Sequence, residues 1–386
     1  MRHDWTTFGF TQDQQMMRES VLDLLERELP VERVRELDSN SEFPLAAYNA
    51  LAKGGWLGLP FGKEWGGSDG SHMDRAVLVE ALGYHYLNIG TAFLMNTTYA
   101  GQHLNLHASD YLKQTFIPKI IDGSCRLAIA ITEPEAGSDV ASIRTRAIKR
   151  GDRYVLNGQK TYITLAHMAN YIVTAAKTEP EAGAKGISLF LVPTDAKGLT
   201  IRKLDMLGRR PIHANDVFYA DVEVPAEYLI GEEGSGFRYL MKCLNLERAG
   251  TSAASCGDMQ HIIDYACAYA KERKQFGQPI ANFQAIAHKL ADMRIQAEAS
   301  RLMIWRVAQM LDQGLDPRME TSIAKVFITE AGFNCANLGM QIMGGAGYMM
   351  DHDMQRFFRD SRLGPIGAGT NEIQRNIIAQ NLLGTR

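Results

Sequence analysis

The hydrophobic periodicity of this 386-residue chain changes twice, and this change constrains the fold more than any other feature. Up to about residue 127 apolar side chains recur at helical spacing, as at Met17, Val21, Leu24 and Leu25. Short segments rich in β-branched and aromatic residues follow, and after residues 234–236 the helical period returns. We therefore predict an α+β protein with a helical domain at residues 1–127, a β domain at 128–233 and a helical bundle at 234–386.

Local signals place the individual elements. Thr11-Gln12-Asp13-Gln14 has the pattern of a capping box, and Pro30 should end the helix that it starts. Apolar residues between Ile286 and Leu311 lie on one face of a helix roughly 40 Å long at 1.5 Å per residue. Further helices are predicted at residues 45–53, 74–86 and 111–121, and the strands of an antiparallel sheet or barrel at 154–156, 171–175, 187–192, 199–201 and 217–224.

Composition excludes several classes of function. A formal net charge of -3 provides no basic surface for nucleic acid. Five cysteines without a Cys-x-x-Cys pair fit a reducing compartment. Met1-Arg2-His3-Asp4-Trp5 is followed by no apolar leader, and no run approaches the roughly 18 apolar residues of a membrane span. We therefore expect a cytoplasmic protein with neither a nucleic-acid partner nor an integral membrane segment.

Two polar turns stand out within the β domain. The first, Ala130-Ile-Thr-Glu-Pro-Glu-Ala-Gly-Ser-Asp139, ends a strand-like run with Thr132 and Ser138 beside Pro134 and Gly137. The second, at residues 157–164, places an aromatic ring and a hydroxyl after an Asn-Gly turn. Such turns can bring hydroxyl and N–H groups to a ligand, although most turns of this composition only reverse the chain.

The order of these motifs along the chain resembles the acyl-CoA dehydrogenase family. The two turns are followed by Glu272-Arg-Lys-Gln-Phe-Gly277 and by Gly369-Thr-Asn-Glu-Ile-Gln-Arg375, and Phe43-Pro44 and the Gly-Trp-Leu-Gly-Leu run at residues 55–59 precede them. The resemblance implies FAD bound between a middle β domain and a C-terminal four-helix bundle. It also implies a carboxylate that removes the proton next to a thioester.

The catalytic base is expected at Glu247. Many relatives carry a glutamate just before the terminal Gly-Thr, where this chain has Ala368. Isovaleryl- and long-chain-type relatives instead place the base early in the bundle, in a setting like Leu244-Asn-Leu-Glu-Arg248. A Glu-Arg pair is usually a solvated helix surface, but the missing carboxylate at position 368 favours the catalytic role.

The resemblance also implies the substrate contacts. The backbone N–H of Ala368 should polarise the thioester carbonyl together with a hydroxyl of the FAD ribityl chain, since hydrogen bonds to a developing enolate lower the barrier. Small residues beside it leave room for branching near the reacting carbons. The predicted substrate-binding residues are Ser138, Arg248, Gly367 and Gly369.

For FAD, the resemblance implies contacts from three parts of the chain. Tyr162, where most relatives have Trp, should cover one flavin face. Arg273, Phe276 and Gln284 come from a neighbouring subunit in relatives, which implies a homotetramer built as a dimer of dimers. The full predicted set is Ile131, Thr132, Ser138, Tyr162, Thr164, Arg273, Phe276, Gln284, Gln341, Gly344, Gly345, Thr370 and Asn371.

These residues lead to one expected function and three alternatives. We expect an FAD-dependent acyl-CoA dehydrogenase for short- to medium-chain, including branched, acyl-CoAs, with an electron-transfer flavoprotein as electron acceptor. An enoyl-CoA reductase, a flavin monooxygenase and a non-catalytic flavin protein share the fold. His103 and His107 are spaced for one helix face, but no carboxylate completes a zinc site, so no metal is expected.

Overall fold

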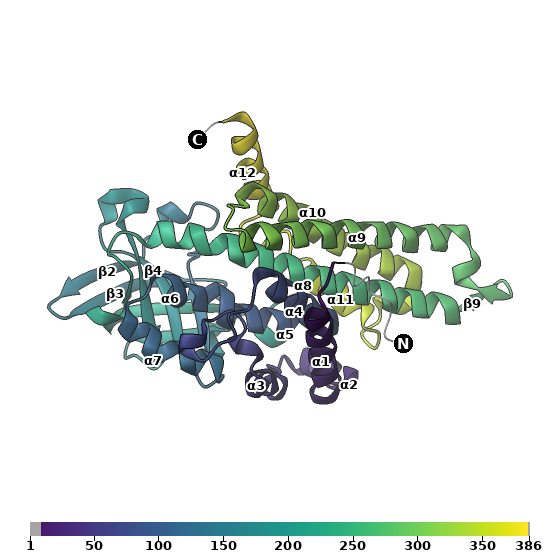
Figure 1. Ribbon diagram of the computed structural model, residues 1–386, viewed down its shortest axis with the longest axis horizontal. Helices are drawn as coiled ribbons and strands as arrows, with labels where there is room; N and C mark the ends of the chain where they lie inside the picture. The colour runs from purple at the N-terminus through teal and green to yellow at the C-terminus, as the bar shows by residue number, and fades with distance from the viewer. Residues whose placement is uncertain (1–8, 385–386) are drawn as a thin grey trace.

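The computed structural model describes residues 9–384, and Met1–Trp5, where no apolar leader was expected, lie outside this range. A mixed sheet occupies one end of the elongated molecule, long helices extend from it to the other end, and the N-terminal helices pack along one side (Figure 1). Within the described residues no helix combines the length and apolar character needed to cross a membrane.

The N-terminal region is helical, as predicted. Thr11 forms the expected capping box with Gln14, and the first helix stops before Pro30. The centre of this region, around Ile89, is buried on all sides because it lies between the outer helices and the long bundle. The helices are α1 (Gln12–Glu28), α2 (Val31–Asn40), α3 (Leu45–Lys53), α4 (His72–His85), α5 (Leu87–Leu94), α6 (Gly101–His107) and α7 (Asp110–Ile121), with a π-helical segment, Met95–Ala100, between α5 and α6.

The middle region is a sheet in the order β6-β7-β3-β2-β4-β5-β8, with β1 paired to β4. All five predicted strands are present, but the sheet is mixed rather than antiparallel, because β4 pairs in parallel with β1 and with β2. The parallel pair carries the end of β1 to the site described below. The strands are β1 (Leu127–Ala130), β2 (Arg146–Arg150), β3 (Arg153–Lys160), β4 (Tyr171–Lys177), β5 (Ile187–Pro193), β6 (Leu199–Lys203), β7 (Asn215–Pro225) and β8 (Leu229–Ile230).

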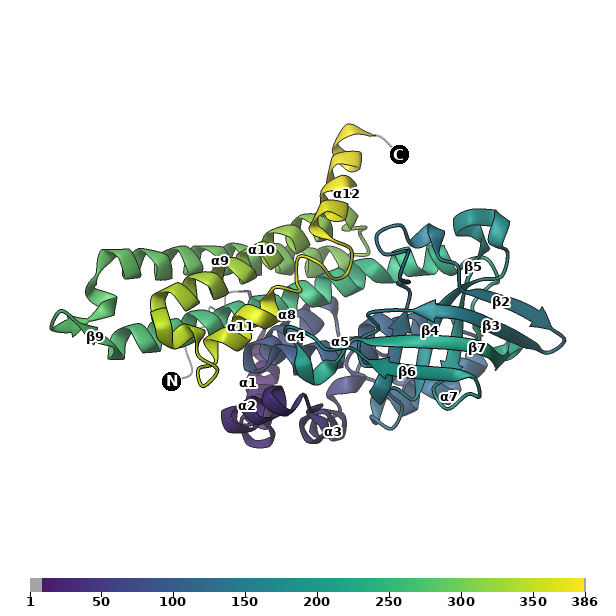
Figure 2. The same cartoon turned by 180° about the vertical axis from the view of Figure 1, so that it is seen from behind.

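The C-terminal region is helical, and α8, α9 and α10 run side by side over much of the molecule's length (Figure 2). α4 packs closely on α8 where Gly83 and Gly257 face the partner backbone; a Cβ at Gly83 would lie 2.1 Å from the carbonyl oxygen of Ala254. α12 projects away from the long helices (Figure 1). The elements are α8 (Gly236–Glu272), β9 (Lys274–Gln275), β10 (Gln278–Pro279), α9 (Gln284–Asp312), α10 (Arg318–Met343), α11 (Met354–Ser361) and α12 (Asn371–Leu383).

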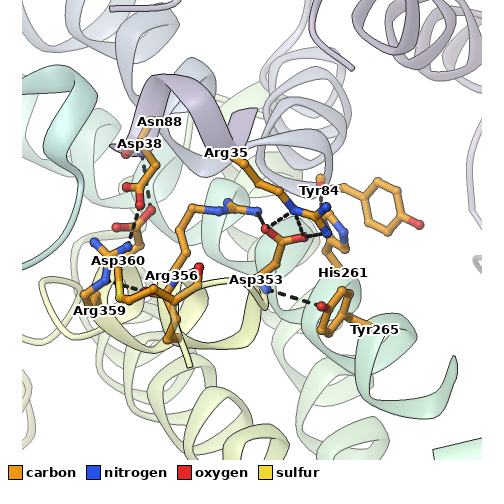
Figure 3. Close-up of polar contacts among 12 residues, drawn as sticks. Arg35, Asp38, Tyr84, Asn88, His261, Tyr265, Asp353, Arg356, Arg359 and Asp360 are labelled. Atoms are coloured by element: carbon orange, nitrogen blue, oxygen red, sulfur yellow. Dashed lines mark hydrogen bonds and ion pairs between the residues drawn. The ribbon is translucent and has the colours of Figure 1, made fainter. Parts of the chain in front are cut away.

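A buried ionic cluster joins the three regions at α11 (Figure 3). Arg359 donates to Asp38 of α2 at 2.5 Å and to the carbonyl oxygen of Leu207, in the turn before β7, at 3.1 Å. Asp360 accepts a hydrogen bond from the backbone N–H of Arg209. Since α11 leads directly into the segment that carries Ala368, this cluster anchors one end of that segment.

Candidate functional site

The two polar turns of the middle region meet at the end of β1. The N–H of Thr161 donates to the carbonyl oxygen of Thr132 at 2.9 Å. Lys160, at the end of β3, contacts the first turn, because its Nζ donates to the carbonyl oxygen of Ile131 at 2.9 Å. The structure therefore brings together two segments that are separated by about twenty residues in the sequence.

A buried ion pair that sequence reasoning missed holds this junction. Lys160 donates to Glu133 at 2.8 Å, and the same carboxylate accepts the backbone N–H groups of Arg144 and Thr145 at 2.6 and 2.9 Å. Burial lowers the pKa of Lys160 to about 8 against the attraction of Glu133. Burial opposes ionisation of Glu133 as well, but Lys160 and the hydrogen bonds outweigh it and hold that pKa below its ordinary value. Both groups are therefore charged at neutral pH.

The surface above this pair presents unused donors beside a flat ring. Within the part of the chain that the structure describes, the hydroxyls of Thr132, Ser138 and Thr164 have no protein partner. The Tyr162 side chain is 69% exposed, and its backbone has a positive φ of 60°. A Cβ added at Gly137 would meet no atom within 4 Å. Free hydroxyls, open space and an exposed aromatic ring are the groups that a flat, polar cofactor requires.

Glu247 and Arg248 lie on α8, where the helix passes the C-terminal loop. Burial raises the pKa of Glu247 to about 7, and the positive charge of Arg248 only partly opposes this shift. The Glu247 carboxylate has no hydrogen-bond partner among residues 9–384. Its backbone carbonyl accepts from Thr251 at 2.9 Å, and Thr251 in turn contacts the hydroxyl of Tyr99, on the π-helical segment, at 2.6 Å. A partly buried carboxylate with a pKa near neutrality is suited to act as a general base.

The loop that joins α11 to α12 faces this part of α8. Arg248 donates to the carbonyl oxygen of Ala368 at 3.1 Å and to the side chain of Asn245 at 3.2 Å. Ala368 has a positive φ of 56°. Its N–H has no acceptor in the described chain, so it is free to donate to a ligand. The predicted base and the predicted carbonyl-binding N–H therefore belong to two segments that Arg248 joins.

The remaining loop residues divide by environment. A Cβ at Gly367 would approach only the carbonyl oxygen of Leu363, at 3.7 Å, so this position borders open space. Gly369 has a φ of 81°, and a Cβ there would lie 2.9 Å from the Gln374 side chain. Thr370 caps α12 through the N–H of Ile373.

Asn371 is buried against α10 rather than open to a ligand. Its amide contacts Lys325 at 2.8 Å, Thr329 at 3.2 Å and Glu330 at 3.1 Å. These contacts leave the predicted cofactor role of Asn371 to its main chain.

The other predicted FAD residues lie at the far end of the helical region. Arg273 directly follows α8 and lies about 39 Å along the helix from Glu247, at 1.5 Å per residue. It is next to the β9 hairpin, which Figure 2 shows at the end of the molecule opposite the sheet. Phe276 in this hairpin is 92% exposed. One chain therefore does not bring these residues to its own polar turns. They are Arg273, Phe276, Gln284 and, at the distal end of α10, Gln341, Gly344 and Gly345.

Three family models together match nearly the whole chain. The N-terminal, middle and C-terminal domains of acyl-CoA dehydrogenase match residues 11–124, 128–222 and 234–383. The chain belongs to the acyl-CoA dehydrogenase family. It is thus a flavoprotein oxidoreductase with FAD as cofactor, and the free hydroxyls around Tyr162 fit that group.

Relatives of this acyl-CoA dehydrogenase family member are named both as dehydrogenases and as parts of reductases. The chain is 38% identical over 378 residues to the probable acyl-CoA dehydrogenase YngJ of Bacillus subtilis, covering 97% of this chain and 99% of the relative. It is 36% identical to a subunit of the caffeyl-CoA reductase-Etf complex of Acetobacterium woodii, with the same coverage. The butyryl-CoA dehydrogenase structure from Megasphaera elsdenii superposes with a TM-score of 0.94 at 30% identity, covering 97% of this chain and 99% of that one.

The two candidate metal ligands have other surroundings. His103 is buried, and His107 stacks on Tyr239 with 4.0 Å between ring centroids. Across residues 9–384, no group of three His, Cys, Asp or Glu side chains is placed to hold a metal ion.

Proposed function

We propose that this protein oxidises a short- to medium-chain acyl-CoA to the trans-2-enoyl-CoA, with Glu247 as the base. The observation that carries the proposal is the pairing of a carboxyl group whose pKa is near 7 with an unpaired N–H at Ala368, on two segments that Arg248 connects. An α proton next to a thioester is acidic enough for a carboxylate only when the carbonyl is polarised.

Each group has a separate task in this reaction. The Glu247 carboxylate takes the α proton, and the Ala368 N–H donates to the thioester oxygen as enolate charge develops. Arg248 fixes the Ala368 carbonyl and hence the plane of the following peptide. Thr132, Ser138, Tyr162 and Thr164 would hold the flavin, and Ser138 would also border the substrate. Bound FAD supplies the acceptor for the hydride that leaves the β carbon.

The experiment that tests this function is anaerobic mixing with a panel of straight and branched acyl-CoAs. We expect at least one acyl-CoA to reduce the flavin, which is seen as a loss of flavin absorbance after mixing, and to yield the enoyl-CoA as product. An enoyl-CoA reductase, which the name of the relative from A. woodii brings into consideration, would instead reoxidise its reduced flavin faster with enoyl-CoA than it bleaches with acyl-CoA. A monooxygenase or a non-catalytic flavin protein would not bleach with any acyl-CoA.

Branched substrates are favoured by the open space at Gly367. Apart from its two chain neighbours, only the Leu363 carbonyl oxygen lies within 4 Å of a Cβ built at this position, so a substrate methyl group bound beside Gly367 would have room. In the same panel we therefore expect turnover of isovaleryl-CoA in addition to turnover of butyryl-CoA.

We also propose that the active unit is a homotetramer, a dimer of dimers, that passes its electrons to an electron-transfer flavoprotein. The position of Arg273 beside the β9 hairpin, at the end of the molecule opposite the sheet, supports this assembly, because a second copy would then supply Arg273, Phe276 and Gln284 to the flavin. The named association of one relative with Etf supports the electron acceptor.

Arg273→Ala should lower FAD occupancy and weaken the oligomer together, because a guanidinium that binds pyrophosphate across an interface links the two. Flavin content and light scattering measure both quantities on one sample. A fully flavinylated monomer of the unchanged protein would contradict the assembly, whereas an Arg273→Ala variant with full FAD content and an intact tetramer would contradict the role of Arg273 in it.

A further inference from the structure

A buried lysine without a role in the reaction as described lies behind the loop that carries Ala368. Lys325, on α10, is fully buried. Its Nζ donates to the carbonyl oxygens of Gly369 at 3.0 Å and Pro365 at 3.4 Å, and to Oδ1 of Asn371 at 2.8 Å. An ammonium group has three donors, and here each has an acceptor. Two of the three acceptors are main-chain oxygens on either side of Ala368.

These contacts hold a backbone conformation that needs support. Ala368 and Gly369 both have positive φ, at 56° and 81°, and for alanine this left-handed region is unfavourable. Arg248 holds the carbonyl of Ala368, while Lys325 and Gln374 hold the carbonyl of Gly369, at 3.0 and 3.1 Å. The peptides that follow Ala368 are thus held by two cations and an amide, and its own N–H points to no protein acceptor.

The positive charge of Lys325 lies in a buried environment that disfavours it. Burial lowers the pKa of Lys325 to about 8, and the nearby positive charge of Arg248 lowers it too, against attraction from Glu372 and Glu330. Two cations packed behind one loop destabilise the fold relative to apolar side chains of similar volume. The same positive potential would stabilise negative charge on a ligand that accepts the Ala368 N–H.

We propose that Lys325 is a positioning residue for α-proton removal: it sets the Pro365–Asn371 segment so that the Ala368 N–H meets the thioester oxygen, and it adds positive charge behind the enolate. This inference rests on the function proposed above. Lys325 acts through Ala368 and does not contact the substrate.

The test compares three variants of the FAD-loaded protein. Lys325→Met keeps the side-chain length and removes the charge and the donors, and Lys325→Arg keeps the charge. Thr329→Val is the matched control, because it removes only neutral hydrogen bonds from the same face of α10, those with the Asn371 amide and with the carbonyl oxygens of Lys325 and Val326. Flavin content and far-UV circular dichroism show that each variant is folded and loaded.

Kinetics give the first measurement. We expect Lys325→Met to lower kcat for flavin reduction by about 10- to 100-fold, the range for a misplaced catalytic group, with KM changed by less than about threefold. Lys325→Arg should recover most of the loss, and Thr329→Val should retain the unchanged kcat. A Lys325→Met protein with unchanged kcat, or one whose loss follows only its FAD content, would overturn the proposal.

The second measurement isolates proton removal from hydride transfer. An acyl-CoA analogue with sulfur at the β position can lose its α proton but cannot transfer a hydride, and its enolate is detected by charge-transfer absorbance with oxidised flavin. At a given pH, Lys325→Met should deprotonate less of the bound analogue than the unchanged protein or Thr329→Val. Equal deprotonation in all three would overturn the proposal.

Failure to fold and failure of the proposed function have separate signatures. If Lys325→Met does not fold, Lys325→Gln, whose amide can still donate to a loop carbonyl, replaces it with the same expected and contrary results. Unchanged protein that bleaches with acyl-CoA while the lysine variants match it would overturn the role of Lys325 alone. Unchanged protein that bleaches with no acyl-CoA would overturn the proposed function and this inference with it.

Discussion

Glu247→Gln should bind FAD and acyl-CoA as the unchanged protein does, yet its flavin should be reduced about 10²–10⁴ times more slowly, the usual contribution of a general base. The amide keeps the size and shape of the carboxyl group but cannot accept the α proton. Stopped-flow absorbance under anaerobic conditions measures the rate. Glu28→Gln on α1, where the glutamate is exposed, is the control and should leave the rate unchanged.

The pH dependence follows from the same residue. Burial raises the pKa of Glu247 to about 7, and only the ionised form can take a proton. We therefore expect kcat/KM to rise with pH, to reach half its maximum near pH 7 and to level off above it, since kcat/KM reports the free enzyme. A profile that is flat between pH 5 and 9 would contradict Glu247 as the base.

Arg359→Met should destabilise the protein by about 3–5 kcal/mol, because it leaves a buried charge in the interdomain cluster unpaired. It removes the ion pair to Asp38 and the hydrogen bond to the carbonyl oxygen of Leu207. It also leaves Asp38 beside Asp360, whose pKa is raised by burial and by that neighbouring carboxylate. The side chains from α2 and α11 converge in Figure 3.

Urea unfolding followed by circular dichroism measures this loss. The matched control is Arg153→Met, which breaks the exposed pair with Glu223 and should cost only about 0–1 kcal/mol. Equal unfolding midpoints for the two variants would show that the cluster does not hold the three regions together.

Most elements of this fold follow from the hydrophobic period of the sequence, but the pairing of the strands does not. Strands β4, β5 and β7 are rich in β-branched and aromatic residues and are predicted to within a few residues. β2, Arg146–Arg150, has one buried residue and four exposed ones, three of them charged, so no alternation marks it. The parallel pairing of β1 with β4 joins segments about forty residues apart, and neither strand carries a local signal for its partner.

The site shows a similar division. The family pattern and the alanine at position 368 together indicate Glu247 as the base, and this role stays a prediction. Lys160 and Lys325 could not be predicted, since a lysine in isolation is expected to be solvated. A signal for Lys325 does exist: it lies between Ala324 and Ile328 on the apolar face of α10, one turn from Thr321. A lysine at a buried helical position requires acceptors, which only the folded loop supplies.

The most direct test of the account is to move the base. Ala368→Glu, added to Glu247→Gln, places a carboxylate at the alternative position that the family resemblance implies for the base, and Arg248 already connects that loop to α8. The rate of anaerobic flavin reduction by acyl-CoA is the measurement. If Glu247 and position 368 face the same α carbon, the double variant should reduce its flavin faster than Glu247→Gln alone. A double variant that is folded, binds FAD and is no faster than Glu247→Gln would contradict the assignment of the base and the loop to one site.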